Sequence, residues 1–366
     1  MKYCTACGSK NADEARFCTS CGKPFSHRET ASKKTSPSGN VISDFFTDYI
    51  GTQKSELNWK ILFTDIFKQH TREEAEEIFI CGTKQTTPAP SSVLSEMPKP
   101  WLYSRVFAVF FIAAVFLWIC CSVFQNSKTL PGLIMLGSLT VPLSVMIMFL
   151  ELNVWKDCSV YNVIIIFLIG GCASLTATLF LFAFSPNGDS DYIEAAIIGF
   201  VEEAGKAIIV YFFLKSVKHA TILRALLIGA CVGAGFAAFE SAGYAFEIFF
   251  AGGFDSMLSN IFLRGFLSPG GHVVWAAISG AGMVIASKAV GKPIDTSILS
   301  DAKFLRLFAI PVVLHALWDC PLNSMILPEL YAGPIFLLIC AWIVILILIN
   351  MGLAEVRQAN PQIRNL

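Results

Sequence analysis

The feature that most constrains this chain is a series of long apolar runs that begins at Trp101 and ends near Leu353. Each run is near or above the roughly 20 residues that a helix needs to cross a bilayer. The sequence therefore predicts an all-α polytopic membrane bundle of about eight helices. The predicted spans cover about residues 101–124, 130–151, 161–184, 192–214, 222–250, 271–290, 304–322 and 330–353.

The composition supports a membrane protein with a polar N-terminal appendage. Only 15% of the 366 residues are charged, the mean hydropathy is +0.62, and the apolar runs start after the first hundred residues. An average soluble domain carries roughly 25% charged residues. The first ten residues lack the apolar segment of a cleavable signal peptide. A net charge of zero gives no reason to expect a nucleic-acid partner.

Two cysteine pairs at the N-terminus predict a zinc ribbon over residues 1–25. Cys4 and Cys7 are separated by two residues, as are Cys18 and Cys21. Two such pairs supply four thiolates for a tetrahedral structural zinc ion. The segment is too short for a hydrophobic core, so the metal stabilises it. The alternative of two disulfides is disfavoured, because a cytosolic segment is kept reduced.

The residues between the ribbon and the first span predict a small helical module flanked by linkers. The polar segments 26–40 and 83–99 read as linkers. Residues 41–82 contain apolar side chains at helical spacing and read as a small cytosolic helical module at the membrane surface. Within it, Thr71 and Glu74 have the spacing of a capping box and Gly82 marks a helix end.

The distribution of lysine and arginine predicts that both termini, including the tail 354–366, are cytosolic at the plasma membrane. Positively charged loops remain on the cytosolic side. The opposite side carries Lys128 and Arg264, and its connection 251–270 reads as containing a short interfacial helix. The cytosolic cations are Lys99, Lys156, Lys215, Lys218, Arg224, Lys288, Lys292, Lys303, Arg306, Arg357 and Arg364.

Ionisable side chains interrupt four of the predicted spans. Such residues cost several kcal/mol within a bilayer and are candidates for function. Counted at 1.5 Å per residue, all of them lie within roughly 17 Å of the outer face. We therefore expect them to face one another across a water-accessible pocket. They are Glu202, Glu203 and Lys206 in the fourth span, Glu240 in the fifth, His272 in the sixth, and His315 and Asp319 in the seventh.

The spacing of these residues along their helices supports contacts between them. Lys206 follows the two glutamates by three and four residues, so it can pair with either. Asp319 lies four residues after His315 and can orient its imidazole. The fifth span also carries small residues at intervals of four, which allow close helix packing. Any one of these polar groups alone is equally compatible with a structural ion pair, whereas seven at one depth favour a functional site.

Three motifs in this region resemble those of the PrsW-type intramembrane proteases within the CAAX protease superfamily. They are EExxK at 202–206, FxxxE from Phe236 to Glu240, and HxxxD from His315 to Asp319. The CAAX branch would instead have Arg at position 207 and His at position 240. The resemblance covers roughly residues 100–353 and gives His272 a role through the segment GGHVVWA. It implies a protease acting on membrane-anchored proteins such as anti-sigma factors.

The leading hypothesis is therefore an intramembrane peptidase that uses an activated water. Glu203 or Glu202 would be the general base. Glu240, His272 and His315 would form either a zinc site with an open water position or a metal-free cradle for water and oxyanion. Asp319 would hold His315 in one tautomer. The alternatives are an ion- or proton-coupled transporter, for which no inverted repeat is visible, and a membrane sensor.

Overall fold

The computed structural model describes residues 2–3, 9–11, 20, 41–53, 57–93, 96–186, 188, 190–291, 293–322 and 331–359. The chain splits into two compact units, Met1–Asn40 and Val41–Leu366. In the first unit, β1 (Lys2–Tyr3) pairs antiparallel with β2 (Lys10–Asn11). The four ribbon cysteines and the linker 26–40 lie outside the described residues.

The second unit starts with short helical elements. These are α1 (Val41–Ile50), the 3-10 turn η1 (Trp59–Phe63), α2 (Arg72–Phe79) and the 3-10 turn η2 (Pro90–Ser92). The predicted capping box of α2 is confirmed: the Glu74 backbone N–H donates to Thr71 Oγ1, and the Thr71 N–H donates to Glu74 Oε2. The helix ends at Phe79, and Gly82 follows with φ of 77°.

These short elements pack directly against the long helices, in the same compact unit. Tyr49 donates its hydroxyl hydrogen to the Arg306 carbonyl at 3.0 Å, and Cys81 Sγ contacts the Cys158 carbonyl at 3.1 Å. The assignment of residues 41–82 as a small cytosolic helical module at the membrane surface stays a prediction. Side-chain bonds to distant backbone groups, which no local pattern reveals, hold these residues in place.

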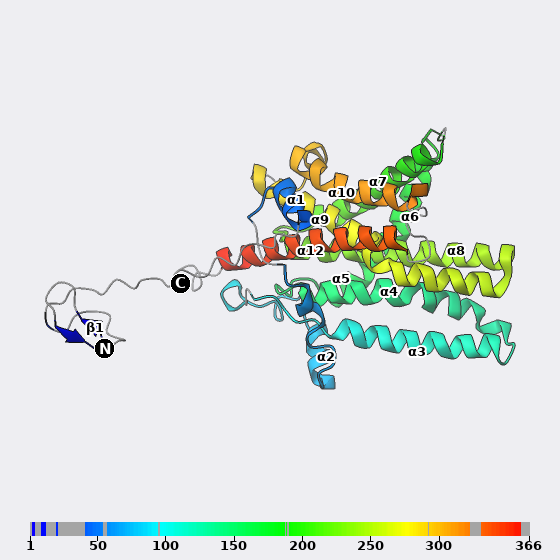
Figure 1. The fold of residues 1–366 in the computed structure, drawn as a ribbon, viewed down its shortest axis with the longest axis horizontal. Coiled ribbons are helices and arrows are strands. Elements are labelled where there is room, and N and C mark those ends of the chain that lie inside the picture. Colours follow the sequence, from blue (N-terminus) through cyan, green and yellow to red (C-terminus); the bar gives the residue numbers. More distant parts are fainter. Residues whose placement is uncertain are drawn as a thin grey trace. The chain divides into compact units, whose positions relative to one another are not determined.

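Long helices make up the rest of the unit (Figure 1). The third predicted span contains a π-helical turn, η4, between α5 and α6. The elements are α3 (Leu102–Ser122), η3 (Ser127–Thr129), α4 (Leu130–Leu152), α5 (Val160–Ile165), η4 (Ile166–Gly170), α6 (Gly171–Phe182), α7 (Asp191–Lys215), α8 (Ile222–Leu267), η5 (Ser268–Gly270), α9 (His272–Val290), η6 (Thr296–Ser300), α10 (Ala302–Asp319) and α12 (Ala332–Ala359).

Five helical segments of the described chain are long and apolar enough to cross a membrane. One of them, Ile222–Val290, contains both α8 and α9. Helices α7 and α10 are absent from the five, because charged side chains interrupt their apolar sequences. The structure thus supports a multi-pass membrane protein, and the count of eight spans stays a prediction. The segments are Leu102–Ser122, Ser127–Leu152, Val160–Phe182, Ile222–Val290 and Ala332–Ala359.

Helix α8 folds back on itself at Gly253, whose φ of 81° and ψ of −172° are not helical. Glycine tolerates this left-handed backbone because it has no Cβ. The returning arm 254–267 packs beside the first arm and α4, and the three reach the same end as α3 (Figure 1). The predicted interfacial helix is therefore the second arm of a hairpin, which carries Arg264 back to the depth of Glu240.

The small residues of the fifth predicted span do bring two helices together. A Cβ on Gly229 would lie 2.2 Å from the Ala276 carbonyl oxygen, and one on Gly233 would lie 2.2 Å from the His272 carbonyl oxygen. Both helices are largely buried in the centre of the unit. The prediction of a close helix contact is confirmed, and the contact fixes where α9 begins.

The opposite ends of these helices gather charged residues that were predicted to share the cytosolic side. Lys288 at the end of α9 pairs with Glu355 of α12, which also accepts a hydrogen bond from the Ile222 N–H. Arg224 pairs with Asp157 at 3.5 Å. The segments around Arg224 and Lys288, which the charge distribution placed on one side, therefore lie at the same end of the helices.

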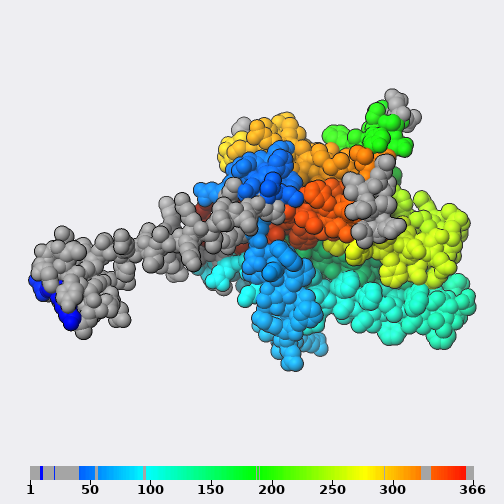
Figure 2. All heavy atoms as spheres, viewed as in Figure 1, coloured from blue at the N-terminus to red at the C-terminus, as the bar shows by residue number. Residues whose placement is uncertain are grey.

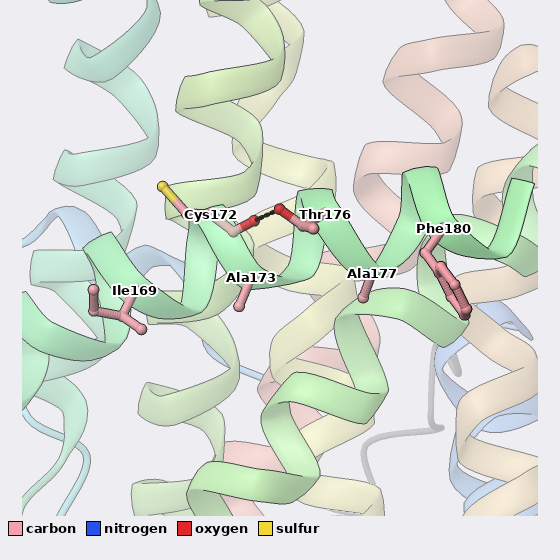
Figure 3. A pocket seen from close by; sticks show the side chains of 6 residues that line it. All are labelled: Ile169, Cys172, Ala173, Thr176, Ala177 and Phe180. Carbon is pink, nitrogen blue, oxygen red and sulfur yellow. Dashed lines mark hydrogen bonds between the residues drawn. The ribbon is translucent and has the colours of Figure 1, made fainter.

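The surface of the unit holds an apolar groove of about 560 Å³ along η4 and α6 (Figure 3). Its one drawn polar contact is the internal bond from the Thr176 hydroxyl to the Cys172 carbonyl at 2.9 Å. The spheres of Figure 2 show the α3–α4 pair and the α8 hairpin side by side at one end. The groove is lined by Ile169, Cys172, Ala173, Thr176, Ala177 and Phe180.

Candidate active site

The structure brings all seven predicted site residues into one cluster, linked by contacts between four helices. Helix α7 supplies Glu202, Glu203 and Lys206, and α8 supplies Glu240. His272 is the first residue of α9, and α10 ends with His315 and Asp319. The expected convergence of these spans is therefore seen in the geometry.

Close helix contacts explain why the four helices meet here. A Cβ on Gly199 of α7 would lie 2.6 Å from the Ala316 backbone nitrogen of α10. Together with the contact between Gly233 and His272, this lets α7, α8, α9 and α10 approach until their polar side chains touch. The sites of closest packing lie within four residues of the glutamates on α7 and directly beside both histidines.

A fully buried ion pair forms the base of the site. The side chains of Lys206 and Glu203 are both 0% exposed, and Lys206 Nζ lies 2.7 Å from Glu203 Oε1. The same oxygen accepts the hydrogen bond of His315 Nδ1 at 2.9 Å. A carboxylate cannot donate, so His315 carries a hydrogen on Nδ1, and its Nε2 faces the carboxylates of Asp319 and Glu202.

His272 is fixed in the opposite tautomer. Lys206 Nζ donates to His272 Nδ1 at 2.8 Å, because an ammonium can only donate. The ring hydrogen of His272 is therefore on Nε2, which donates to Glu240 Oε2 at 3.1 Å. Each imidazole thus has one nitrogen held by a carboxylate, as metal-binding histidines usually do.

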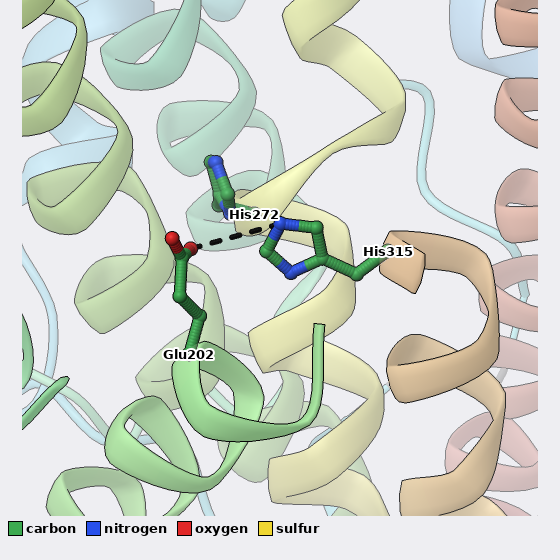
Figure 4. Close-up of side chains that lie close together, drawn as sticks. All are labelled: Glu202, His272 and His315. Atoms are coloured by element: carbon green, nitrogen blue, oxygen red, sulfur yellow. Dashed lines mark ion pairs between the residues drawn. The ribbon is translucent and has the colours of Figure 1, made fainter. Parts of the chain in front are cut away.

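Glu202 lies beside His272 and His315, and an ion pair joins it to His315 (Figure 4). Its side chain is 10% exposed, and its Oε2 lies 3.5 Å from Lys206 Nζ and 3.7 Å from His315 Nε2. That oxygen is buried and receives no hydrogen bond within the described residues. Glu203 Oε2 is also unpartnered there, but the Glu203 side chain is enclosed.

Asp319 approaches the same histidine from the rim of the site. Its Oδ2 lies 3.4 Å from His315 Nε2, and its side chain is 31% exposed. The sequence suggested Asp319 as the residue that fixes the tautomer of His315. In the structure the shorter bond, to His315 Nδ1, comes from Glu203 instead. A residue on another helix could not be assigned this contact from spacing along α10.

Glu202, His272 and His315 have the composition of a metal site. Each offers one ligand atom, and these atoms lie within 4.8 Å of one another. Two imidazoles and a carboxylate leave a fourth position for water at a catalytic zinc ion. The predicted set had Glu240 in place of Glu202. The structure places Glu240 on His272 Nε2, where a carboxylate orients a histidine.

The formal charges of the cluster are compatible with a divalent cation. Its four carboxylates face two permanent cations, Lys206 and Arg264, which leaves two negative charges while both imidazoles are neutral. Unbalanced charge is costly inside a membrane protein. Either a divalent ion or two imidazolium ions would restore the balance, and Glu202 Oε2, a buried oxygen that receives no hydrogen bond within the described residues, fits such a ligand.

Sequence reasoning missed several residues of the site. Arg264 was assigned to an outer loop, whereas it pairs with Glu240. Trp275 stacks on His315 with ring centroids 4.6 Å apart, and the Lys206 ammonium lies 4.2 Å above the ring of Phe236. The position of Trp275, three residues after His272 on one helix, was the only available signal.

The fold and this cluster define a multi-pass membrane protein with a buried carboxylate–histidine site. Residues 159–349, just over half of the chain, match the model of the PrsW family of intramembrane metalloproteases. The chain belongs to this family. Residues 3–25 match a zinc-ribbon domain. No curated protein and no solved structure matches the chain.

Proposed function

We propose that this chain hydrolyses peptide bonds of membrane-anchored protein substrates near the outer membrane face, using a water activated by glutamate and histidine. The family model supports an intramembrane protease. The meeting of four carboxylates, two histidines and one lysine from α7–α10 supports hydrolysis at that site. The observation that carries the proposal is Glu202 Oε2, which receives no hydrogen bond within the described residues and lies 3.7 Å from His315 Nε2.

In the metal-free version, Glu202 is the general base. Its carboxylate takes a proton from water while the water oxygen forms a bond to the peptide carbonyl carbon. The proton then passes to the amide nitrogen as the carbon–nitrogen bond breaks, so that a carboxylic acid and an amine are formed. Glu202 is assigned this role because its side chain is 10% exposed, whereas that of Glu203 is 0% exposed and is held by Lys206 and His315.

The other residues orient the reacting groups. Glu203 holds His315 through Nδ1, so that Nε2 faces Glu202 and Asp319. Glu240 holds His272 through Nε2. Lys206 keeps Glu203 ionised and aligned by direct contact. These positions pre-organise donors and acceptors before substrate arrives, which lowers the cost of reaching the transition state.

A divalent metal, for which zinc is our proposal, would be held by Glu202, His272 and His315. When bound, the metal would polarise the carbonyl of the scissile peptide bond and allow a bound water to ionise near neutral pH. The His272 nitrogen available to it now accepts a hydrogen bond from Lys206. Glu203 and Glu240 would keep the same positioning roles on the two rings.

Two further proposals concern the substrate and the ribbon. The site lies among membrane helices, so a substrate must present an extended peptide segment there, as a single-span protein can. Regulated proteolysis such as anti-sigma factor cleavage is a process of this kind. We also propose that one structural zinc ion is held by Cys4, Cys7, Cys18 and Cys21, which lie within the segment that matches a zinc ribbon.

The test of the proposed function is cleavage of a purified single-span substrate by the full chain in detergent, compared with the Glu202→Gln variant. Cleavage by the wild type and its loss in the variant support a peptidase. Absence of cleavage with a panel of single-span substrates, together with Glu202-dependent proton flux in liposomes, would identify the transporter alternative instead.

We expect about two zinc ions per purified chain, one in the ribbon and one in the membrane site. Replacing Cys4 and Cys7 with Ser should leave about one ion. Adding His315→Ala should remove the second, because the site then loses an imidazole ligand. Inductively coupled plasma mass spectrometry measures both contents. An active Cys4→Ser/Cys7→Ser variant without bound metal would establish the metal-free version.

We expect the tip of the α8 hairpin to face the outside and the α7–α8 loop to face the cytosol. A cysteine at Gly252 should therefore react with an impermeant maleimide on intact cells, and a cysteine at Lys218 only after lysis. The asymmetry of lysine and arginine is the physical reason. The unsubstituted chain controls for native cysteines, and labelling of Lys218→Cys on intact cells would reverse the orientation.

A further inference from the structure

Arg264 on the returning arm of α8 contacts three groups at the site. Its Nη2 pairs with Glu240 Oε2, and its Nε donates to the Ser241 hydroxyl oxygen at 2.9 Å. Its guanidinium carbon lies 4.6 Å from the centre of the Tyr244 ring. The side chain is 29% exposed and the Glu240 side chain 12% exposed. The guanidinium is therefore held in one orientation at the edge of the cluster.

The oxygen that Arg264 binds is the one that orients a histidine. Glu240 Oε2 receives both Arg264 Nη2 and the Nε2 hydrogen of His272. His272 in turn accepts from Lys206, and Lys206 pairs with Glu203, which holds His315. A continuous chain of polar contacts thus runs from Arg264 to both imidazoles, and Arg264 is its outermost member.

We propose that Arg264 is a positioning residue of the active site, which acts by fixing the Glu240 carboxylate and through it the ring of His272. This inference rests on the proposed peptidase function. The α8 hairpin is then a part of the catalytic unit, because only the reversal at Gly253 brings residue 264 beside residue 240.

The geometry explains why arginine occupies this position. One nitrogen of the planar fork binds Glu240 while another binds Ser241, the next residue of the same helix. This pair of bonds fixes the direction of the guanidinium and so of the carboxylate oxygen. A lysine would supply the charge to Glu240 with a single point contact. A glutamine would leave a buried carboxylate without its cation.

The experiment compares Arg264→Gln, Arg264→Lys and Glu240→Gln in the full-length chain, using cleavage of one single-span substrate in detergent. We expect Arg264→Gln to lower kcat by about 10- to 100-fold, as removal of a group that orients a metal-ligating or catalytic histidine does. Arg264→Lys should recover most of this loss, with KM nearly unchanged. Lys128→Gln, an exposed cation at the same end of the bundle, is the control and should match wild type.

The double variant Arg264→Gln/Glu240→Gln gives the decisive comparison. If Arg264 acts through Glu240, the double variant should be no slower than Glu240→Gln alone, because coupled residues are not additive. Multiplied losses in the double variant, or a wild-type rate in Arg264→Gln, would overturn the inference while leaving the peptidase function intact.

A second measurement decides the inference without cleavage. Thermal unfolding in detergent should show that Arg264→Gln lowers Tm in the wild-type background but adds little to the change caused by Glu240→Gln. Additive changes in Tm would show that the two side chains are not coupled, and would overturn the proposal even if no substrate were cleaved. Failure of the proposed function alone would appear as coupled Tm values without any proteolysis.

Discussion

Glu202→Gln is expected to abolish cleavage while the chain remains folded. The substitution keeps the size of the side chain but removes the proton acceptor, and it would also weaken a metal ligand. General acid–base groups contribute about 10²- to 10⁴-fold to rate, so kcat should fall by at least about two orders of magnitude. The effect on stability should be smaller than that of Glu203→Gln, because Glu202 Oε2 receives no hydrogen bond within the described residues and lies 3.5 Å from Lys206 Nζ, against 2.7 Å for Glu203 Oε1.

The measurement is proteolysis of a single-span substrate by purified protein, with thermal unfolding recorded on the same samples. Glu194→Gln is the matched control, since Glu194 is an exposed glutamate in the first turn of the same helix. It should cleave at the wild-type rate. Full activity in Glu202→Gln would contradict the assignment of Glu202 as base or ligand, and would shift attention to Glu203.

Glu203→Gln is expected to lower the free energy of unfolding much more than Glu202→Gln does. Glu203 and Lys206 are both 0% exposed and only 2.7 Å apart. Removing one member of a buried ion pair costs about 3–5 kcal/mol, because the remaining charge is left uncompensated. Glu203→Gln also removes the strong acceptor for His315 Nδ1, so activity should be lost together with stability.

A double variant tests whether Glu203→Gln lowers the free energy of unfolding because it leaves the charge of Lys206 unpaired. Glu203→Gln with Lys206→Met removes both charges, and replacement of a buried pair by apolar or neutral groups is often close to neutral for stability. The double variant should therefore be more stable than Glu203→Gln alone, as measured by Tm or denaturant midpoint. If instead the double variant is less stable than Glu203→Gln, the ion pair with Lys206 is not the main way in which Glu203 stabilises the fold.

The sequence by itself determined the class of protein and singled out seven residues of the candidate site. Runs of apolar residues fixed the long helices, since their length and composition suit a bilayer. The charged residues that interrupt those runs are costly there, which singled out Glu202, Glu203, Lys206, Glu240, His272, His315 and Asp319. The structure gathers all of them. The ribbon cysteines are equally visible from spacing, and a zinc-ribbon match covers them.

Only the tertiary structure decided which role each residue can take. Glu202 and Glu203 are neighbours in sequence, yet they point about 100° apart on a helix of 3.6 residues per turn. Glu202 therefore lies between His315 and Lys206 with one oxygen that receives no hydrogen bond within the described residues, while Glu203 is enclosed by Lys206 and by His315 of α10. The contact of Glu240 with His272 Nε2 was also not visible in the sequence, because it depends on how α8 packs against α9.

The place of Arg264 shows most clearly what sequence patterns leave undecided. A lone arginine between two apolar spans reads as a loop residue, because positive charge usually marks the membrane boundary. A single glycine with a left-handed backbone reverses the helix and returns Arg264 to the depth of Glu240. Hydrophobic periodicity records where helices are, but long-range pairing between polar groups depends on backbone turns and close packing that are set only when the whole chain is folded.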